Sequence, residues 1–260
     1  MKLITLNTWG ARAGHREFLD YAKQKSSEVD IFCFQEIWNV KDEKSKAVAS
    51  LLNDSIVGGV VLHNMMEDLY VQISTVLPDF NGFFRPHYGE HYGLAMFIKK
   101  DLDLVEEGDV FVYKDRDFEP TGDVGNHARN IQYANINTLD GLVTVINFHG
   151  LWNGKGKTDT DDRILQSTNI VNFINKVTNP IVLCGDFNLL PDTESLKMFE
   201  NTGLVNLVKK FDIKSTRTSL YKKEHRFADY IFTSPGIKVK DFRVLPDEVS
   251  DHSPLYIEFE

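Results

Sequence analysis

The sequence predicts an α/β protein built as a four-layer sandwich, in which two packed mixed β-sheets are flanked by helices. Short apolar segments of strand length recur along the whole chain, and helical patterns alternate with them near both ends. The middle of the chain is mostly strand, which favours two sheets packed on each other with the helices outside. Because no linker, repeat or low-complexity segment divides the chain, we expect one domain over residues 1–260.

The expected strands are short apolar runs rich in β-branched and aromatic residues. In chain order they are Leu3–Leu6, Ile31–Phe34, Leu94–Ile98, Val110–Tyr113, Ile131–Ile136, Leu142–Phe148, Ile181–Cys184, Tyr230–Phe232 and Leu255–Phe259. Helical periodicity, in several cases after an Asp or Thr cap, predicts the helices between them. These are His15–Ser26, Lys44–Asn53, Glu67–Val76, Asp161–Val177 and Thr193–Asn201.

The composition limits the class of protein. With 42% hydrophobic and 12% aromatic residues, the chain can bury one sizeable core. Its net charge of -9 repels polyanions, so a nucleic-acid substrate would need a local basic patch. Cys33 and Cys184 lie in apolar runs and are expected to be reduced core residues. With no apolar run long enough to cross a bilayer and no signal-peptide core, we expect a soluble, cytoplasmic monomer without membrane insertion.

Polar side chains stand at the ends of several expected strands, where core packing does not require them. They are Asn7, Gln35, Glu36, His149, Asp186, Asn188, Asp251 and His252. Each alone is most simply explained as a helix cap, a turn residue or a salt bridge. Together, their carboxylates, imidazoles and carboxamides form a set suited to a hard divalent cation and a phosphate group. Because α/β proteins place chemistry at strand ends, we expect these side chains to converge.

The motifs that carry these residues resemble the endonuclease/exonuclease/phosphatase superfamily. They are Leu-Asn7-Thr-Trp, Phe-Gln-Glu36-Ile, Asn-Phe-His149-Gly, Gly-Asp186-Phe-Asn188, Ala-Asp229-Tyr-Ile and Ser-Asp251-His252-Ser-Pro. They follow the superfamily's order from residue 7 to residue 252, which is nearly the whole chain. The resemblance implies a four-layer α/β sandwich and hydrolysis of a phosphate ester that depends on Mg²⁺ or Mn²⁺.

The resemblance also implies a role for each residue. Glu36 is the expected first ligand of the metal ion, assisted by Asn7 and Asp251. Asp186 is expected to orient and deprotonate the attacking water, and Asn188 to hold that water or the phosphate. His149 and His252 are expected to donate hydrogen bonds to phosphate oxygens as cations. Asp229 is expected to orient His252 and to favour its protonated form.

Other residues suggest how a substrate is held. Arg129 is either a second phosphate clamp or a surface ion pair. Trp152 and Asn153 are expected to bind substrate. The same wall is expected to include Trp9, Trp38, His87, Tyr88, His91 and Tyr92. Arg163 and Gln166 lie on one face of a predicted helix and are expected to brace the loop before it.

Three alternatives remain open from the sequence. The segment from Gly150 to Thr158 ends in Gly-Lys157-Thr158 like a Walker nucleotide-binding loop, but its glycines are one position too far apart. Our preferred interpretation of this loop is a mobile basic flap near the substrate. A noncatalytic phosphate-binding scaffold is the second alternative. The third is a nuclease for abasic or single-stranded DNA, although a soluble phosphodiester is the substrate we favour and the motifs do not identify it.

Overall fold

The structure is a computed structural model that describes residues 1–42, 46, 56–57, 60–61, 65–119, 123 and 125–260. The helix predicted at 44–53 falls, apart from Lys46, outside the described residues. Among the described helices, none combines the length and the apolar character needed to cross a membrane.

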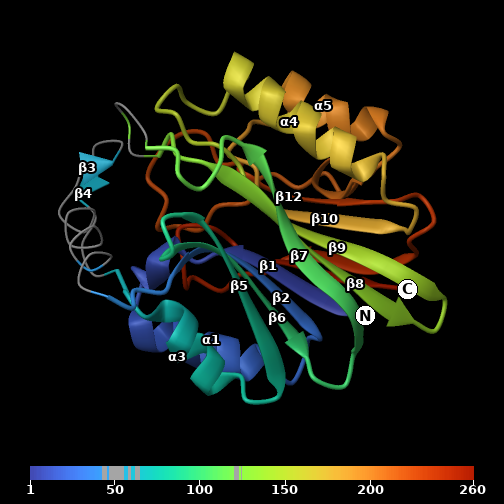
Figure 1. The fold of residues 1–260 in the computed structure, drawn as a ribbon, viewed down its shortest axis with the longest axis horizontal. Helices are drawn as coiled ribbons and strands as arrows, with labels where there is room; N and C mark the ends of the chain where they lie inside the picture. Colours follow the sequence, from blue (N-terminus) through green and yellow to red (C-terminus); the bar gives the residue numbers. More distant parts are fainter. Residues whose placement is uncertain (43–45, 47–55, 58–59, 62–64, 120–122, 124) are drawn as a thin grey trace.

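Two six-stranded mixed sheets form the centre of the molecule (Figure 1). The first sheet has the order β13 (Val239–Val244), β14 (Leu255–Phe259), β1 (Lys2–Asn7), β2 (Ile31–Trp38), β6 (Tyr92–Lys99) and β5 (Phe80–Tyr88). The second has the order β11 (Val205–Asn206), β12 (Asp229–Thr233), β10 (Ile181–Asp186), β9 (Gly141–His149), β8 (Arg129–Thr138) and β7 (Asp103–Tyr113). Each sheet has one parallel pair, β1 with β2 and β9 with β10. A separate two-stranded ladder joins β3 (Ile56–Val57) and β4 (Val60–Val61).

Helices cover the outer faces of both sheets, which gives the four predicted layers (Figure 1). Helices α1 (His15–Lys25) and α3 (Leu69–Val76) pack outside the first sheet. Helices α4 (Asp161–Ile174) and α5 (Glu194–Asn201) cover the second. The short elements are the 3₁₀ helix η1 (Trp9–Ala11) and helix α6 (Leu207–Lys210). The predicted fold class is therefore confirmed.

The alternation of side chains along β2 shows how the layers are held together. Ile31 and Cys33 point into the core between the two sheets, whereas Phe32 and Phe34 pack toward α1 and α3. Because both faces are buried, the strand is a continuous apolar run rather than an alternating one. Cys33 and Cys184 are both free and buried, and burial next to Cys184 raises the pKa of Cys33. The prediction that both cysteines are core residues is confirmed.

The strands that the sequence missed lie at the edges of the sheets. Strand β5 contains Gly82 and Pro86, and β13 mixes charged with apolar residues. Edge strands have one unpaired side and are half exposed, so they tolerate proline and need no continuous apolar run. For the same reason β7 extends well beyond the predicted Val110–Tyr113.

Gly185 allows the two parallel strands of the second sheet to approach closely just before Asp186. Its φ is +138°, and a Cβ at this position would clash with the carbonyl oxygen of Phe148 on β9. Only glycine fits such a contact without a shift of the backbone. The Gly-Asp pair of the motif therefore places the aspartate at the end of β10, directly against β9.

Candidate functional site

Strand register brings three of the predicted residues together at one edge of the second sheet. His149 at the end of β9 lies opposite Asp186 at the end of the parallel strand β10. Asp229 begins β12, which runs antiparallel, and it lies opposite Asp186 on the other side. Residues paired across neighbouring strands are only about 5 Å apart, so the carboxylate of Asp186 lies between the two.

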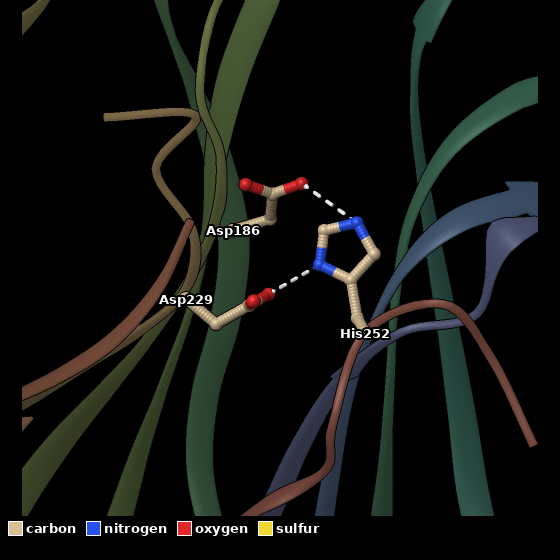
Figure 2. A group of neighbouring side chains, drawn as sticks. All are labelled: Asp186, Asp229 and His252. Atoms are coloured by element: carbon tan, nitrogen blue, oxygen red, sulfur yellow. Dashed lines mark hydrogen bonds and ion pairs between the residues drawn. The ribbon is translucent and has the colours of Figure 1, made fainter. Parts of the chain in front are cut away.

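His252 reaches this edge from the other sheet and connects the two acids (Figure 2). Its Nδ1 lies 2.7 Å from Oδ1 of Asp229, and its Nε2 lies 3.6 Å from Oδ2 of Asp186. Thr216 donates a hydrogen bond of 3.0 Å to the other oxygen of Asp229 and holds that carboxylate in place. The expected pairing of Asp229 with His252 is present in the structure.

Asp186 is buried and hydrogen-bonded on both oxygens. Asn7 donates from Nδ2 to Oδ2 at 2.8 Å, and the backbone N–H of Asn188 donates to Oδ1 at 2.8 Å. Burial opposes ionisation, but His252 and Arg217 lower the pKa of Asp186 well below its ordinary value. The carboxylate is therefore ionised throughout the neutral range and ready to accept a hydrogen bond from water.

Glu36 is turned toward the site by an irregularity in β2. The pairing of β2 with β6 shifts register between Phe34 and Ile37, and Glu36 has a φ of +57°. A left-handed conformation in a residue other than glycine costs about 1–3 kcal/mol and is typical of functional sites. Burial raises the pKa of Glu36 even though Asn7 donates to it at 3.0 Å. The neighbouring Asp251 adds to the rise in the pKa of Glu36.

The structure gives Asn7 contacts that the sequence did not predict. Its amide nitrogen donates to both Glu36 and Asp186, while its Oδ1 accepts the backbone N–H of Trp9 at 2.9 Å. The oxygen that would ligate a metal thus already accepts one hydrogen bond, from Trp9. Asn7 links the two acids through its amide nitrogen, and its role as a metal ligand stays a prediction.

Among the described residues around this site, two groups of side chains have the chemistry to hold a divalent cation. Asp186, Asp229 and His252 offer ligand atoms within 4.8 Å of one another, but they already bond to each other and to Thr216.

Glu36 and Asp251 form the other group. Asp251 binds Arg217 through Oδ2 at 2.9 Å. Its buried Oδ1 accepts no hydrogen bond from a described residue, and Nε2 of His252 lies 3.7 Å from it. A cation between two mutually repelling carboxylates would satisfy that oxygen, so this position fits a metal ion better.

The surroundings of the two histidines affect their protonation in opposite directions. Burial and the nearby Arg129 lower the pKa of His149 to about 3, which keeps its ring neutral. Burial and Arg217 also oppose protonation of His252, but Asp229 and Asp186 raise its pKa above the ordinary value. We expected both His149 and His252 to be cationic donors, but of these two rings the surroundings favour protonation of His252 alone.

A cavity of about 230 Å³ joins these groups. The residues lining it are Trp9, Arg12, Glu36, Trp38, Tyr88, Tyr92, Gly125, His127, Arg129, His149, Trp152, Lys157, Asp186, Asn188, Arg217, Tyr221, Lys223, Asp251 and His252. The residues predicted to bind metal, to activate water and to donate hydrogen bonds to phosphate therefore line one cavity. The exceptions are Asn7 and Asp229, which bond to Asp186 and His252 from outside the cavity lining.

Some predicted substrate contacts lie elsewhere. Asn153 is not among the described residues that line the cavity, because its Nδ2 donates to Thr160 at 3.1 Å. His87 is fully buried behind the wall and bonds to Asn130, and His91 stacks on Trp38. Asn153, His87 and His91 support the loops around the cavity and do not line it.

Arg129 is neither exposed nor in an ion pair with a described residue. It is 1% exposed, and its guanidinium donates to the carbonyl oxygens of Gly125, Ala128 and Gly150. Burial lowers the pKa of Arg129 to about 10, so it remains charged at neutral pH. The alternative that Arg129 forms a surface ion pair is wrong. Arg129 instead lines the cavity with a positive charge that neutral carbonyl oxygens hold in place.

Four further residues of the site have no strong local signal in the sequence. Arg12 follows the first strand motif, and Arg217 and Tyr221 lie in a polar segment before the Asp229 motif. Lys157 stands out in the sequence only through the Walker-like pattern. Only strand pairing and loop packing over long sequence separations bring these four side chains to the cavity.

The loop from Gly150 to Thr158 is not a Walker loop. Helix α4 begins at Asp161, after its cap Thr160, and not at the lysine and threonine of the motif. Arg163 donates to the carbonyl oxygens of Leu151, Gly156 and Thr158, and Gln166 accepts the N–H of Leu151. The expectation that Arg163 and Gln166 brace the loop is confirmed, and the expected mobile flap is instead held to α4.

Solved structures of other proteins share this fold. An endonuclease/exonuclease/phosphatase family protein from Bacteroides thetaiotaomicron is 19% identical, with a TM-score of 0.73, covering 100% of this chain and 97% of its own. A mannosyl-6-phosphatase from B. thetaiotaomicron VPI-5482 is 19% identical, with a TM-score of 0.70 and coverage of 100% and 99%. The catalytic domain of human Nocturnin is 17% identical, with a TM-score of 0.62 and coverage of 100% and 94%.

The chain matches none of the curated protein sequences with which it was compared. A family model described as the endonuclease/exonuclease/phosphatase family matches residues 4–252. Since that match spans nearly the whole chain, the protein belongs to the endonuclease/exonuclease/phosphatase family.

Proposed function

We propose that the protein is a divalent-metal-dependent hydrolase of phosphate esters that acts by in-line attack of a water activated by Asp186. Members of its family are phosphoester hydrolases and generally use divalent metal ions. One observation carries the proposal for this chain. The ionised Asp186 shares a single cavity with His252 and with the carboxylates Glu36 and Asp251.

Asp186 accepts a hydrogen bond from the attacking water and takes its proton as the oxygen attacks phosphorus. Asn7 and the backbone N–H of Asn188 fix both carboxylate oxygens of Asp186. The direction in which Asp186 accepts the hydrogen bond from water is therefore set before substrate binds. His252 donates to a phosphate oxygen, and the neutral His149 adds a second donor through its ring. Arg129 contributes its fixed charge to the same region.

Glu36 and Asp251 would hold the cation, and we propose Mg²⁺ or Mn²⁺ because both ligands are hard oxygens. When bound, the ion polarises the phosphoryl group and stabilises the leaving oxygen. Asp186 has a low pKa and is therefore a weak base, so it needs a water or a phosphoryl group that is already polarised. Arg217 holds Asp251 by Oδ2, which leaves Oδ1 of Asp251 without a hydrogen bond from a described residue.

A metal-titrated assay tests the proposal. Hydrolysis of bis-p-nitrophenyl phosphate and p-nitrophenyl phosphate is measured with no metal and with Mg²⁺, Mn²⁺ and Ca²⁺. We expect release of nitrophenolate to require Mg²⁺ or Mn²⁺ and to saturate with the ion. Rates that stay at the buffer level with every cation would favour the noncatalytic phosphate-binding scaffold.

The sequence favours a phosphodiester as substrate, with abasic or single-stranded DNA as the nuclease alternative. Half-buried aromatic residues in the cavity wall, Trp9, Tyr88 and Trp152, offer faces on which a sugar or base could stack. A side-by-side screen of abasic DNA, single strands, nucleotides and phospholipid head-group esters decides among these classes.

His252 and Asp229 are expected to act as one unit. We expect His252→Ala and Asp229→Ala each to lower kcat by about 100-fold, the loss typical of a removed oxyanion donor. Because Asp229 acts only through the ring, the double variant should be no slower than the slower single variant. Steady-state kinetics of the four proteins measure the coupling. Independent, additive losses would show that the two residues do not work as a pair.

A further inference from the structure

Lys157 is a buried cation with no carboxylate at ion-pair distance among the described residues. It is 6% exposed, and its Nζ donates to the carbonyl oxygen of Phe227 at 2.8 Å. The same ammonium lies 5.0 Å from the centre of the Tyr221 ring. Buried lysines are rare unless an opposite charge compensates them. The protein thus holds a desolvated positive charge against neutral groups, which an anionic ligand would compensate.

The loop that carries Lys157 is fixed from two sides. Arg163 on α4 binds the carbonyl oxygens of Gly156 and Thr158, the residues that flank the lysine. The backbone oxygen of Lys157 accepts the N–H of Leu190, which follows the Asp186 motif. The ammonium is therefore preorganised relative to the end of β10, and binding a ligand does not require ordering the loop.

The position of Lys157 connects it to the hydrolytic residues. It lines the same cavity as Asp186, Asn188 and His252. Burial and the neighbouring Arg217 lower the pKa of Lys157 to about 8, so the group is still mostly protonated at neutral pH. Arg217 differs from Lys157 because it already neutralises Asp251. Lys157, like Arg129, is therefore a cation of this cavity whose charge no carboxylate at ion-pair distance compensates among the described residues, and Lys157 is the one on the loop that packs against the Asp186 motif.

We infer that Lys157 is a substrate-binding residue that contacts a non-bridging oxygen of the phosphoryl group and favours a terminal phosphate over an internal diester. A terminal phosphate ester carries two negative charges near neutral pH and a diester carries one, so a fixed ammonium attracts the monoester more strongly. The cavity of about 230 Å³ has room for a phosphoryl group and an attached ring.

This inference rests on the proposed hydrolysis and replaces the diester preference drawn from the sequence. The sequence alone could not show that a loop lysine is buried beside Asp186. Terminal phosphates on small ring-bearing molecules, such as sugar phosphates or nucleotides, are the chemical class that the cavity favours.

The test compares p-nitrophenyl phosphate with bis-p-nitrophenyl phosphate, two substrates that share one leaving group and differ in charge. Lys157→Met keeps the apolar stem and removes the ammonium. We expect kcat/KM for the monoester to fall by about 30-fold, the worth of one charged hydrogen bond, and for the diester by less than about fivefold. Lys157→Arg should restore part of the monoester activity. Lys155→Met, at an exposed position of the same loop, should change neither substrate.

Binding of inorganic phosphate, measured by calorimetry, is the second readout and should weaken in Lys157→Met but not in Lys155→Met. Thermal unfolding verifies that each variant is folded, and Lys157→Gln replaces the methionine variant if that one is not. Equal losses on both substrates, or unchanged phosphate binding, would overturn the inference. A wild-type protein that cleaves neither substrate with any cation would instead refute the proposed function itself.

Discussion

Replacing Asp186 by asparagine is expected to lower kcat by about a thousandfold, within the range for loss of a positioned general base. The amide has nearly the same shape, so the contact with the N–H of Asn188 can persist, but it has no negative charge to take a proton from water. Because Glu36 and Asp251 are the proposed ligands, the affinity for Mg²⁺ should change little. Stopped assays give kcat, and calorimetry gives the metal affinity.

Asp192→Asn is the matched control for this variant, because Asp192 is exposed on the segment that follows the Asp186 motif. It should keep wild-type kcat and metal affinity. Retained turnover in Asp186→Asn would refute the assignment of the base. Loss of metal binding in that variant would show that the ion binds within the group of Asp186, Asp229 and His252 instead.

Replacing Glu36 by glutamine is expected to weaken Mg²⁺ or Mn²⁺ binding by more than about 100-fold. Loss of a residue that only supports a metal ligand costs roughly 10–100-fold, and Glu36 is proposed to be a ligand itself. Burial and Asp251 disfavour the charge on Glu36, as its raised pKa indicates, and a bound cation would offset that cost. The metal-free variant should therefore be at least as stable as the wild type. The rise in melting temperature on adding metal should largely disappear, and thermal unfolding with and without Mn²⁺ measures both effects.

Glu90→Gln, at an exposed position in the turn between β5 and β6, is the control and should leave metal binding and metal-induced stabilisation unchanged. If Glu36→Gln binds metal as tightly as the wild type while Asp229→Asn does not, the ligands we propose are wrong. The outcome thus separates the two candidate cation positions by a measurement that needs no substrate.

The sequence predicts the central strands of both sheets, but it does not predict the strands at the sheet edges. Strands such as β2 and β10 are buried on both faces, so their apolar runs stand out. Strands β5 and β13 lie at sheet edges and carry mixed residues, which leaves no clear pattern. Their pairing depends on β6 and β14, and local composition does not report that dependence.

For the candidate site too, the sequence predicts some features and not others. Glu36, Asp186 and His252 line one cavity as the motifs predict, although β2 and β14 belong to the first sheet and β10 belongs to the second. The packing of the two sheets on each other brings these strand ends together. The orientation of Asn7 could not be foreseen, since it depends on Trp9 and two acids from different strands. The neutral state of His149 depends on burial and on Arg129, which lies on another strand.

By itself the sequence determined the layered α/β architecture, the family and the set of acids, amides and imidazoles at the strand ends. Only the tertiary structure decided what the side-chain oxygen of Asn7 accepts, for which histidine protonation is favoured, and that Lys157 is buried in the cavity of Asp186. The physical reason is that motifs and periodicity are local properties of the chain. Desolvation and hydrogen-bond partners arise from packing between residues that are far apart in sequence.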